Sequence, residues 1–227
     1  MKNILSKKEK VKAGFIFLGI ALLFVSVLIL RYGDVNLTGS LIEFAAETEV
    51  LFPGVEEETV RSDSSFMGRY ANRVYHLIFS VFLIYGFLGR KNLKKRKYLN
   101  LALIYISVQV ISTFLITEGV KRVVGRPRPE VAMEEGYRLK PFSGRTGYQS
   151  FPSGHASDAF SSAGVIWMFS PSPVIGGVAV AYSSFISLSR VTRGRHHVSD
   201  VAAGMAAGFS VGLILMYKKY KGDEGQS

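Results

Sequence analysis

Long apolar segments alternate with polar and charged segments along the whole chain. A helix of about 20 mostly apolar residues can cross the hydrocarbon core of a membrane, which is roughly 30 Å thick. The pattern therefore predicts an all-α membrane protein, organised as one integral membrane domain over residues 1–227. Six transmembrane helices are expected, near residues 12–31, 70–89, 98–120, 154–170, 171–190 and 199–217.

The first apolar run, Ala13–Leu30, follows a basic N-terminal segment and has two interpretations. It could be the apolar core of a secretory signal peptide, but it is longer than such cores usually are. The residues that follow, Leu30–Asn36, also lack the small-x-small pattern of a cleavage site. We therefore expect an uncleaved anchor helix.

The basic residues are distributed unevenly between the two sides of this six-helix arrangement. The N-terminal segment, the loop after the second helix and the C-terminal segment share one side, and they hold 14 of the 28 Lys and Arg residues but only three of the 17 acidic residues. The formal charge of +11 therefore lies entirely on this side. An excess of Lys and Arg in short loops marks the cytoplasmic face. We expect a protein of the bacterial inner membrane with both termini in the cytoplasm.

Composition restricts the possible chemistry and partners. The chain has no cysteine, which excludes disulfides, thiolate metal sites and cysteine nucleophiles. In a soluble protein a charge of +11 would suggest a nucleic-acid partner. Here the membrane orientation explains the charge, so no nucleic-acid partner is expected, and no obligatory protein partner either.

The first loop on the opposite, periplasmic side spans residues 32–69 and is rich in acids. Within it, Leu41–Phe52 has apolar residues at near-helical spacing, which is typical of a helix lying in the membrane interface. Pro53 and Gly54 would end such a helix.

Unusual polar residues are concentrated in the other two periplasmic loops and at the helix ends beside them. Three motifs occur there: Lys121-x6-Arg128-Pro129, Pro152-Ser153-Gly154-His155 and Ser189-Arg190-x5-His196-x3-Asp200. All three lie on the same side of the six-helix arrangement. The sequence therefore predicts one active site at the periplasmic face.

Several motif residues suit a phosphate ligand. Guanidinium groups bind phosphate through paired N–H donors and an ammonium binds it as a point charge, which favours Lys121, Arg128 and Arg190 as phosphate-binding residues. Each arginine of Arg126-Pro-Arg128-Pro is expected to be extended because it precedes a proline. At the start of the fourth helix, Ser153 is a possible cap, and the free N–H groups there favour an anion. Gly154 would let that backbone approach closely.

His196 and Asp200 would share a helix face if the sixth helix began near His196. An aspartate bonded to one imidazole nitrogen fixes the tautomer and leaves the other nitrogen free to attack. His155, from another helix, can supply a proton to a leaving oxygen. A nucleophile, an orienting acid, a proton donor and surrounding cations favour phosphoryl transfer, with no metal and no other cofactor required.

The three motifs match, in order, spacing and every defined position, those of the type 2 phosphatidic acid phosphatase superfamily, which this chain resembles. That superfamily includes vanadium haloperoxidases, but these are larger and soluble, whereas this chain is similar to the membrane branch. The resemblance implies that His196 forms a phosphohistidine, that Asp200 orients it, and that His155 is first the acid and then the base. It also implies that the phosphate is held by Lys121, Arg128, Ser153, Gly154 and Arg190.

The same resemblance implies a phosphatase acting on a membrane lipid, either a phosphomonoester or a pyrophosphate. The stretch over residues 125–157 is similar to lipid A 1-phosphatases, which favours lipid A 1-phosphate as the substrate. Phosphatidylglycerophosphate and undecaprenyl pyrophosphate are alternative substrates, and transfer of phosphate from lipid to lipid is an alternative activity. A transporter or lipid-binding protein, the third class considered, has no need of a nucleophile, an orienting acid and a proton donor together.

Other residues near the motifs have more than one interpretation. His197 is expected to be a loop or interface residue and not a metal ligand, because adjacent histidines diverge. Arg193 and Arg195 either bind a lipid headgroup or form an ordinary basic rim. For Asp158, three roles stay open: tuning His155, pairing with Arg122, or satisfying a polar bundle interior.

His76 and Arg73, near the outer end of the second helix, are expected to extend their polar ends toward the membrane surface, with a functional role as the alternative. The last helix carries glycines at every fourth position, Gly204, Gly208 and Gly212. Such a stripe favours close helix packing, with dimerisation as the alternative.

Overall fold

The computed structural model describes residue 6 and residues 9–16, 33–48 and 71–224 of the chain. Within these residues the fold is helical and contains no strand, which confirms the expected all-α class. Residues 9–16 are helical. The other elements are α2 (Asp34–Thr48), α5 (Arg73–Leu88), α6 (Leu93–Gln109), η1 (Val110–Thr117), α7 (Glu118–Val124), α8 (Pro129–Glu135), η2 (Thr146–Tyr148), α9 (Gly154–Phe169), α10 (Pro173–Thr192) and α11 (Val198–Glu224).

Three of the described segments are long and apolar enough to cross a membrane: Lys94–Glu135, Pro173–Thr192 and Val198–Gly222. α5 is apolar but has only 16 residues. α9 also has 16 residues, and ten of them, including three serines, are buried among the other helices, so this helix does not need an apolar surface toward lipid. The first expected helix lies largely outside the described residues. The count of six spanning helices therefore stays a prediction.

A single helical rod runs from Leu93 to Val124 through α6, η1 and α7, and so extends beyond both ends of the helix expected over 98–120. Its middle part, η1, is a π-helix of eight residues. In it, the Thr117 hydroxyl donates to the Ser112 carbonyl oxygen, 2.8 Å away. π-Helical turns are rare and frequently lie near functional sites. Here the π-helix directly precedes the short helix that carries Lys121.

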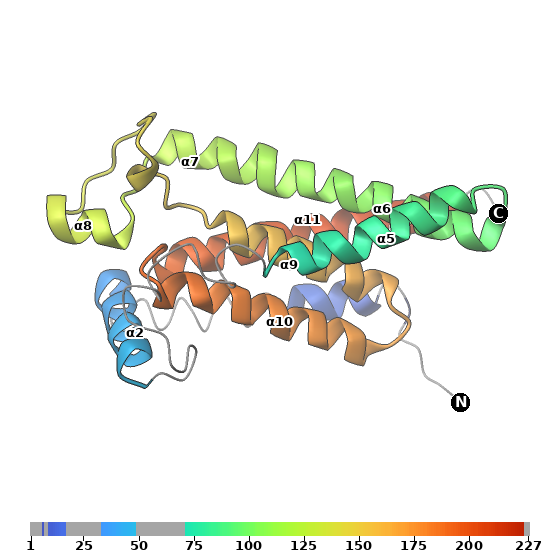
Figure 1. The fold of residues 1–227 in the computed structure, drawn as a ribbon, viewed down its shortest axis with the longest axis horizontal. Coiled ribbons are helices and arrows are strands. Elements are labelled where there is room, and N and C mark those ends of the chain that lie inside the picture. The colour runs from blue at the N-terminus through green and yellow to red at the C-terminus, as the bar shows by residue number, and fades with distance from the viewer. Residues whose placement is uncertain (1–5, 7–8, 17–32, 49–70, 225–227) are drawn as a thin grey trace.

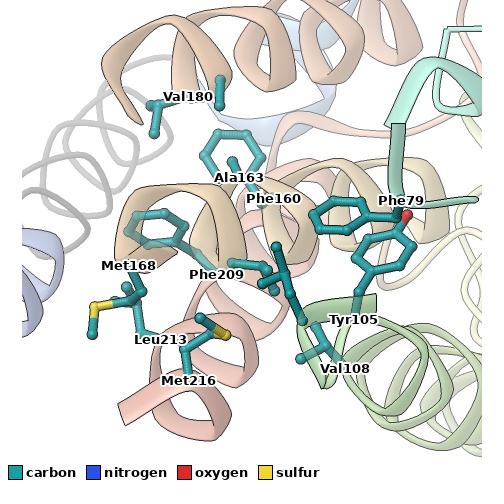
Figure 2. Packing of buried hydrophobic residues seen from close by; sticks show 13 residues of the cluster. Phe79, Tyr105, Val108, Phe160, Ala163, Met168, Val180, Phe209, Leu213 and Met216 are labelled. Atoms are coloured by element: carbon teal, nitrogen blue, oxygen red, sulfur yellow. The ribbon is translucent and has the colours of Figure 1, made fainter. Parts of the chain in front are cut away.

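The hydrophobic core surrounds α9 (Figure 2). Phe160 of α9 meets Phe209 of α11 edge to face, with ring centroids 6.1 Å apart. On the other side, Phe79 of α5 stacks on Tyr105 of α6 at 3.7 Å. Val180 of α10 adds a fifth helix to the same buried cluster. α9 is therefore fixed on several sides, and its N-terminus, which carries the second motif, is held in place.

α11 approaches α9 so closely that glycine is required along the contact. A Cβ at Gly208 would lie 2.1 Å from the Ser157 carbonyl oxygen, and Cβ atoms at Gly204 and Gly212 would lie 2.4 and 2.6 Å from other carbonyl oxygens of the facing segment. Interiors packed at crystal-like density cannot absorb such overlaps cheaply. The glycine stripe therefore serves packing within the chain, which confirms the favoured interpretation.

The two ends of the bundle differ in chemistry (Figure 1). The basic turn between α5 and α6 and the C-terminal end of α11 lie at one end. α2, α8, the loop after α7 and the turn between α10 and α11 lie at the other. The three motifs thus gather at the end remote from the basic turn.

α2 begins at Asp34, earlier than the interfacial helix expected over Leu41–Phe52, and ends at Thr48. Residues 49–52 lie outside the described part of the chain. Leu41 packs against a buried cluster that includes Val191 of α10 and Val201 of α11. α2 is therefore attached to the helices that carry the third motif, and its location in the membrane interface stays a prediction.

Candidate active site

Lys121 and Gly154 bring the first two motifs together. Lys121 lies in α7 and not in the loop expected over 121–153, because α7 continues past it to Gly125, which adopts a left-handed conformation with φ 57°. The Lys121 ammonium lies 3.1 Å from the position that a Cβ on Gly154 would occupy. A larger residue at 154 would crowd this ammonium. Glu118, one turn before Lys121, pairs with it at 2.5 Å.

Arg128 adopts the extended backbone expected before proline, with φ −67° and ψ 158°. Its N–H donates to the Gly147 carbonyl oxygen at 2.8 Å. Two residues earlier, the Arg126 carbonyl oxygen accepts from the Ser150 N–H at 3.1 Å. These bonds hold the first motif along the segment that leads into α9.

Ser153 is the residue before α9, as expected for a cap, but its hydroxyl makes no capping bond. Its N–H donates to the Asp200 carbonyl oxygen at 2.9 Å, which ties the second motif to the third. The Ser153 side chain is buried, and its hydroxyl has no hydrogen-bond partner among the described residues. A buried, unsatisfied hydroxyl beside the N–H groups of a helix N-terminus is suited to an anion.

Arg190 lies in the last turn of α10, which continues two residues past its expected end, to Thr192. Its side chain is only 2% exposed. Gly194, with φ 63°, then reverses the chain. The N–H groups of Arg195 and His196 both donate to the Arg190 carbonyl oxygen, at 3.1 and 3.2 Å. The third motif therefore folds back on itself, and Arg190 is fixed relative to His196.

His196 precedes α11, which begins at Val198, so the condition under which His196 and Asp200 would share a helix face is not met. The imidazole is 3% exposed, and its Nδ1 lies 2.8 Å from the Ser150 carbonyl oxygen. Because a carbonyl oxygen can only accept, Nδ1 carries the proton. Nε2 is then the unprotonated ring nitrogen, and its lone pair can attack.

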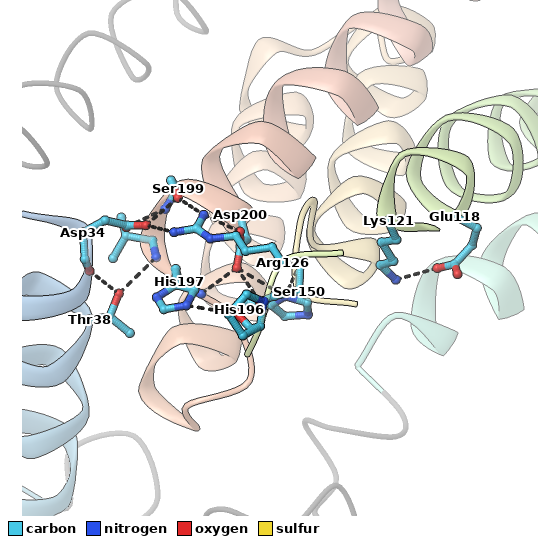
Figure 3. A network of polar contacts seen from close by, with 12 residues as sticks. Asp34, Thr38, Glu118, Lys121, Arg126, Ser150, His196, His197, Ser199 and Asp200 are labelled. Atoms are coloured by element: carbon cyan, nitrogen blue, oxygen red, sulfur yellow. Dashed lines mark hydrogen bonds and ion pairs between the residues drawn. The ribbon is translucent and has the colours of Figure 1, made fainter. Parts of the chain in front are cut away.

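Asp200 is held by several donors behind the imidazole (Figure 3). Its Oδ2 accepts from the Ser150 hydroxyl at 2.5 Å and from the His197 N–H at 2.8 Å. Its Oδ1 accepts from the Arg126 guanidinium at 2.7 Å. The distance from Oδ2 to His196 Nδ1 is 4.0 Å, longer than a hydrogen bond. Orientation of His196 by Asp200 stays a prediction, and the structure adds Ser150 between the two.

Neither Ser150 nor Arg126 is predicted from the sequence to be a member of the site. Ser150 precedes the second motif and acts partly through its backbone, which no side-chain pattern reveals. Arg126 was noted only for its extended backbone. Arg126-Pro127 repeats the Arg128-Pro129 pair of the first motif. This repetition could have indicated that a second guanidinium lies in the same region.

The pKa of His196 lies well below its ordinary value. Burial is the largest cause, because it disfavours the charged ring, and the nearby charges of Arg190, Arg128 and Lys121 act in the same direction. The imidazole is therefore neutral at physiological pH, as a nucleophile must be. The structure thus brings the three expected phosphate-binding cations, from the first and third motifs, around this one ring.

His155 is the second residue of α9 and follows Gly154 directly. Its carbonyl oxygen accepts from the Asn72 side-chain amide at 3.1 Å, and the same amide donates to Asp158 at 2.8 Å. These bonds connect the start of α9 to the start of α5. The proton-donor role of His155 stays a prediction.

Asp158 and His76 form a polar cluster one turn beyond His155. His76 Nε2 lies 3.3 Å from Asp158 Oδ2, and His76 Nδ1 lies 2.5 Å from the Tyr105 hydroxyl. The expectation that His76 extends toward the membrane surface is therefore wrong, because its polar atoms bond within the protein. Asp158 pairs with His76 and not with Arg122.

His197 lies in the loop that precedes α11, as expected from the sequence, and it is fully buried. Its Nε2 lies 3.3 Å from the Pro127 carbonyl oxygen, and its ring meets Tyr137 edge to face at 6.1 Å. Burial and the charge of Arg126 lower the pKa of this imidazole. The His197 side chain therefore supports the loop of the first motif. Arg193 is also buried, at 3% exposure, which does not fit an ordinary basic rim.

Comparisons with known proteins agree with this arrangement. Residues 97–223, which contain all three motifs, match the PAP2 superfamily. The lipid A 1-phosphatase of Rhizobium etli is 31% identical over 118 residues, covering 51% of this chain and 50% of that protein. The lipid A 1-phosphatase of Rhizobium johnstonii is 32% identical over 111 residues, 48% of this chain and 45% of that protein.

A third relative is eukaryotic. The probable diacylglycerol pyrophosphate phosphatase 1 of Schizosaccharomyces pombe is 27% identical over 169 residues, 61% of this chain and 60% of that protein. The chain spans about half the length of the two rhizobial relatives. No solved structure matches the chain significantly.

Proposed function

Because the chain belongs to the PAP2 superfamily, we propose that it is an integral membrane phosphatase that removes phosphate from a membrane lipid through a phosphohistidine on His196. The observation that carries this proposal is the state of His196. Its ring is buried and neutral, its Nδ1 proton is held by the Ser150 carbonyl oxygen, and its unprotonated Nε2 belongs to a ring that lies near three cations.

In the proposed first step, His196 Nε2 attacks the phosphorus atom while the bond from phosphorus to the lipid oxygen breaks. His155 donates a proton to that oxygen. In the second step, His155 takes a proton from water as the water attacks the phosphohistidine. Inorganic phosphate leaves, Nε2 regains its lone pair, and Nδ1–H stays bonded to the Ser150 carbonyl oxygen throughout.

The cations have a defined part in this reaction. Charge spreads over the equatorial oxygens of the phosphoryl group in the transition state, and fixed positive groups stabilise it. Lys121, Arg128 and Arg190 would supply these charges. The Ser153 hydroxyl and the backbone at Gly154 would add hydrogen-bond donors to the same oxygens. Since these groups can neutralise the developing charge, the proposed steps require no metal ion.

We place this site at the periplasmic face of a bacterial inner membrane, with both termini in the cytoplasm. Two observations support the placement. The Lys- and Arg-rich segments mark a cytoplasmic side by their composition, and the motifs lie at the end of the bundle remote from the basic turn between α5 and α6.

For the substrate, we propose lipid A 1-phosphate, supported by two relatives with that activity in their names. A lipid pyrophosphate is the second candidate, supported by the longer match to a probable diacylglycerol pyrophosphate phosphatase. The same phosphohistidine could form from either lipid, because both present a terminal or singly esterified phosphate to the nucleophile.

A panel assay tests the proposal. The purified protein in detergent would be given lipid A 1-phosphate, diacylglycerol pyrophosphate, undecaprenyl pyrophosphate, phosphatidic acid and phosphatidylglycerophosphate separately, and released phosphate would be measured. We expect the largest kcat/KM with lipid A 1-phosphate. Preference for a glycerophospholipid would refute the substrate assignment, and no release from any lipid would refute the activity.

The same assay separates a hydrolase from a phosphotransferase. With a ³²P-labelled donor lipid and an unlabelled acceptor lipid, a hydrolase releases label as inorganic phosphate. Label that appears in the acceptor lipid instead would assign phosphotransfer.

A further inference from the structure

Asp34, the first residue of α2, contacts the active-site region although it lies outside the segment that matches the PAP2 superfamily. Its Oδ1 accepts from the Ser199 N–H at 3.1 Å, and its Oδ2 accepts from the Ser199 hydroxyl at 2.6 Å. Four residues on, the Thr38 hydroxyl accepts from the Val198 N–H at 3.3 Å. The first N–H groups of a helix have no partner within it. α2 therefore caps the N-terminus of α11 from another helix.

The Asp34 carboxylate also forms an ion pair with Arg126. Arg126 is 9% exposed and uses both arms of its guanidinium, Nη2 toward Asp34 and Nη1 toward Asp200 (Figure 3). Burial raises the pKa of Asp34, but hydrogen bonds from Ser199 and Arg126 outweigh that effect and leave it below its ordinary value. One guanidinium therefore bridges two carboxylates, one from α2 and one from the third motif.

These contacts form a continuous path from α2 to the nucleophile. Asp34 holds Arg126, Arg126 holds Asp200, and Asp200 accepts from the Ser150 hydroxyl. The Ser150 carbonyl oxygen in turn holds Nδ1 of His196. Every side chain on this path is buried or partly buried, so solvent does not replace a lost contact easily.

α2 also packs against the turn that carries His196. Ile42 lies 3.5 Å from the position that a Cβ on Gly194 would occupy, and Leu41 packs beside Val191 and Val198. The polar contacts of Asp34 and Thr38 are thus continued by apolar contacts along the same helix. Movement of α2 would disturb both ends of the turn between α10 and α11.

We propose that Asp34 is a positioning residue for the phosphatase reaction, which fixes Arg126, Asp200 and the start of α11 so that His196 is aimed at phosphorus. The inference rests on the proposed function, since it assigns a part in that reaction to a residue that touches neither substrate nor nucleophile. A positioning residue acts on kcat and leaves the phosphate-binding cations unchanged. α2 is then an integral part of the active site.

The test compares Asp34→Asn, Asp34→Ala and the matched control Glu43→Gln, which removes one exposed carboxylate from the same helix. Misplacement of a reacting group by about 1 Å can lower the rate about 10²-fold, so we expect kcat to fall about 100-fold in Asp34→Ala. In Asp34→Asn, which keeps a hydrogen-bond acceptor, we expect kcat to fall about 10-fold. We expect Glu43→Gln to match the wild type. KM and the inhibition constant of inorganic phosphate should stay within about 2-fold in all three, because Lys121, Arg128 and Arg190 are unaltered.

Arg126 gives a second, independent arm of the test. Arg126→Lys keeps the charge and one donor, and we expect it to retain more kcat than Arg126→Gln, at an unchanged inhibition constant for phosphate. A wild-type kcat in Asp34→Ala would overturn the inference. So would a fall in kcat accompanied, in every variant, by an equal weakening of inhibition by inorganic phosphate. If the wild type released no phosphate, the proposed function would fail instead, so the two failures are distinguishable.

Discussion

Two histidine–aspartate pairs in the described part of the chain, His76 with Asp158 and His196 with Asp200, differ in geometry and burial. In the helix bundle, His76 Nε2 and Asp158 Oδ2 are 3.3 Å apart, and the His76 side chain is 45% exposed. In the motif region, His196 Nδ1 and Asp200 Oδ2 are 4.0 Å apart, and both side chains are buried. The pair with the shorter distance is thus not the pair that the motifs assign to catalysis.

The ring nitrogens explain why distance alone is misleading. Both nitrogens of His76 are engaged, one by Asp158 and one by the Tyr105 hydroxyl. Nδ1 of His196 bonds instead to a carbonyl oxygen, which fixes the tautomer and leaves Nε2 unprotonated. A nucleophile needs an unprotonated nitrogen and a neutral ring, and His196 meets both conditions.

The largest expected effect separates the two histidines directly. His196→Ala removes the proposed nucleophile, and we expect phosphate release to fall by on the order of 10⁴-fold or more. His76→Ala and His197→Ala remove histidines that bond within the protein, and we expect each to keep kcat within about 10-fold of the wild type. Initial rates of phosphate release in detergent measure all three.

A label experiment supports the same comparison. Brief incubation with ³²P-labelled lipid followed by alkaline denaturation should leave label on the wild type and on His76→Ala, but not on His196→Ala. Label retained by His196→Ala, or normal turnover in that variant, would contradict the assignment of the nucleophile.

Cations are the second difference between the two regions. Lys121, Arg128 and Arg190 all act on His196. By analogy with single oxyanion-hole donors, Arg190→Gln should cost on the order of 10²–10³ in kcat. The loss of a neighbouring positive charge should also raise the pKa of His196, since the imidazolium is then less disfavoured.

The sign of the pH effect follows from that shift. The proposed mechanism requires a neutral His196, so a higher pKa of His196 would move the acid limb of kcat/KM, which reports the free enzyme, to higher pH. Profiles of the wild type and Arg190→Gln with the same lipid give the shift without interference from ionisation of the substrate. An acid limb that stays in place or moves to lower pH would show that Arg190 does not act on His196 through its charge.

The sequence predicted that the motif residues lie close together, while their roles in catalysis stay predictions. Lys121, Arg128, Arg190 and His196 come from segments far apart in the chain, yet the structure gathers them around one ring. Their gathering could be expected because each lies at a helix end on the same side. The helical class was likewise evident from long apolar runs.

The supporting contacts could not be predicted in the same way. Asp34 reaches Arg126 across 92 positions of the chain, and no local pattern specifies that pairing. Ser150 acts through a backbone carbonyl oxygen, which every residue possesses. α9 was less evident as a membrane helix because it lies inside the bundle and can carry serines where a lipid-facing helix needs apolar residues.

Ser150 gives the smallest and most specific test of the comparison. Ser150→Ala keeps the carbonyl oxygen that holds His196 but removes the hydroxyl that donates to Asp200. A hydrogen bond to a charged group contributes about 1.5 kcal/mol, which corresponds to roughly a 10-fold change in rate. We therefore expect kcat to fall roughly 10-fold if the Asp200 carboxylate positions Ser150 and, through Ser150, the His196 imidazole. The matched control is Ser183→Ala, which also removes a buried hydroxyl, bonded to the Ala159 carbonyl oxygen at 2.9 Å, in the bundle interior.

We expect Ser183→Ala to lower thermal stability about as much as Ser150→Ala while kcat stays at the wild-type value. A kcat that falls equally in both variants would mean that buried hydroxyls matter here only for folding. A kcat that falls in Ser150→Ala alone would mean that Asp200 acts on His196 by way of Ser150, because Asp200 lies 4.0 Å from the imidazole, beyond direct hydrogen-bond distance.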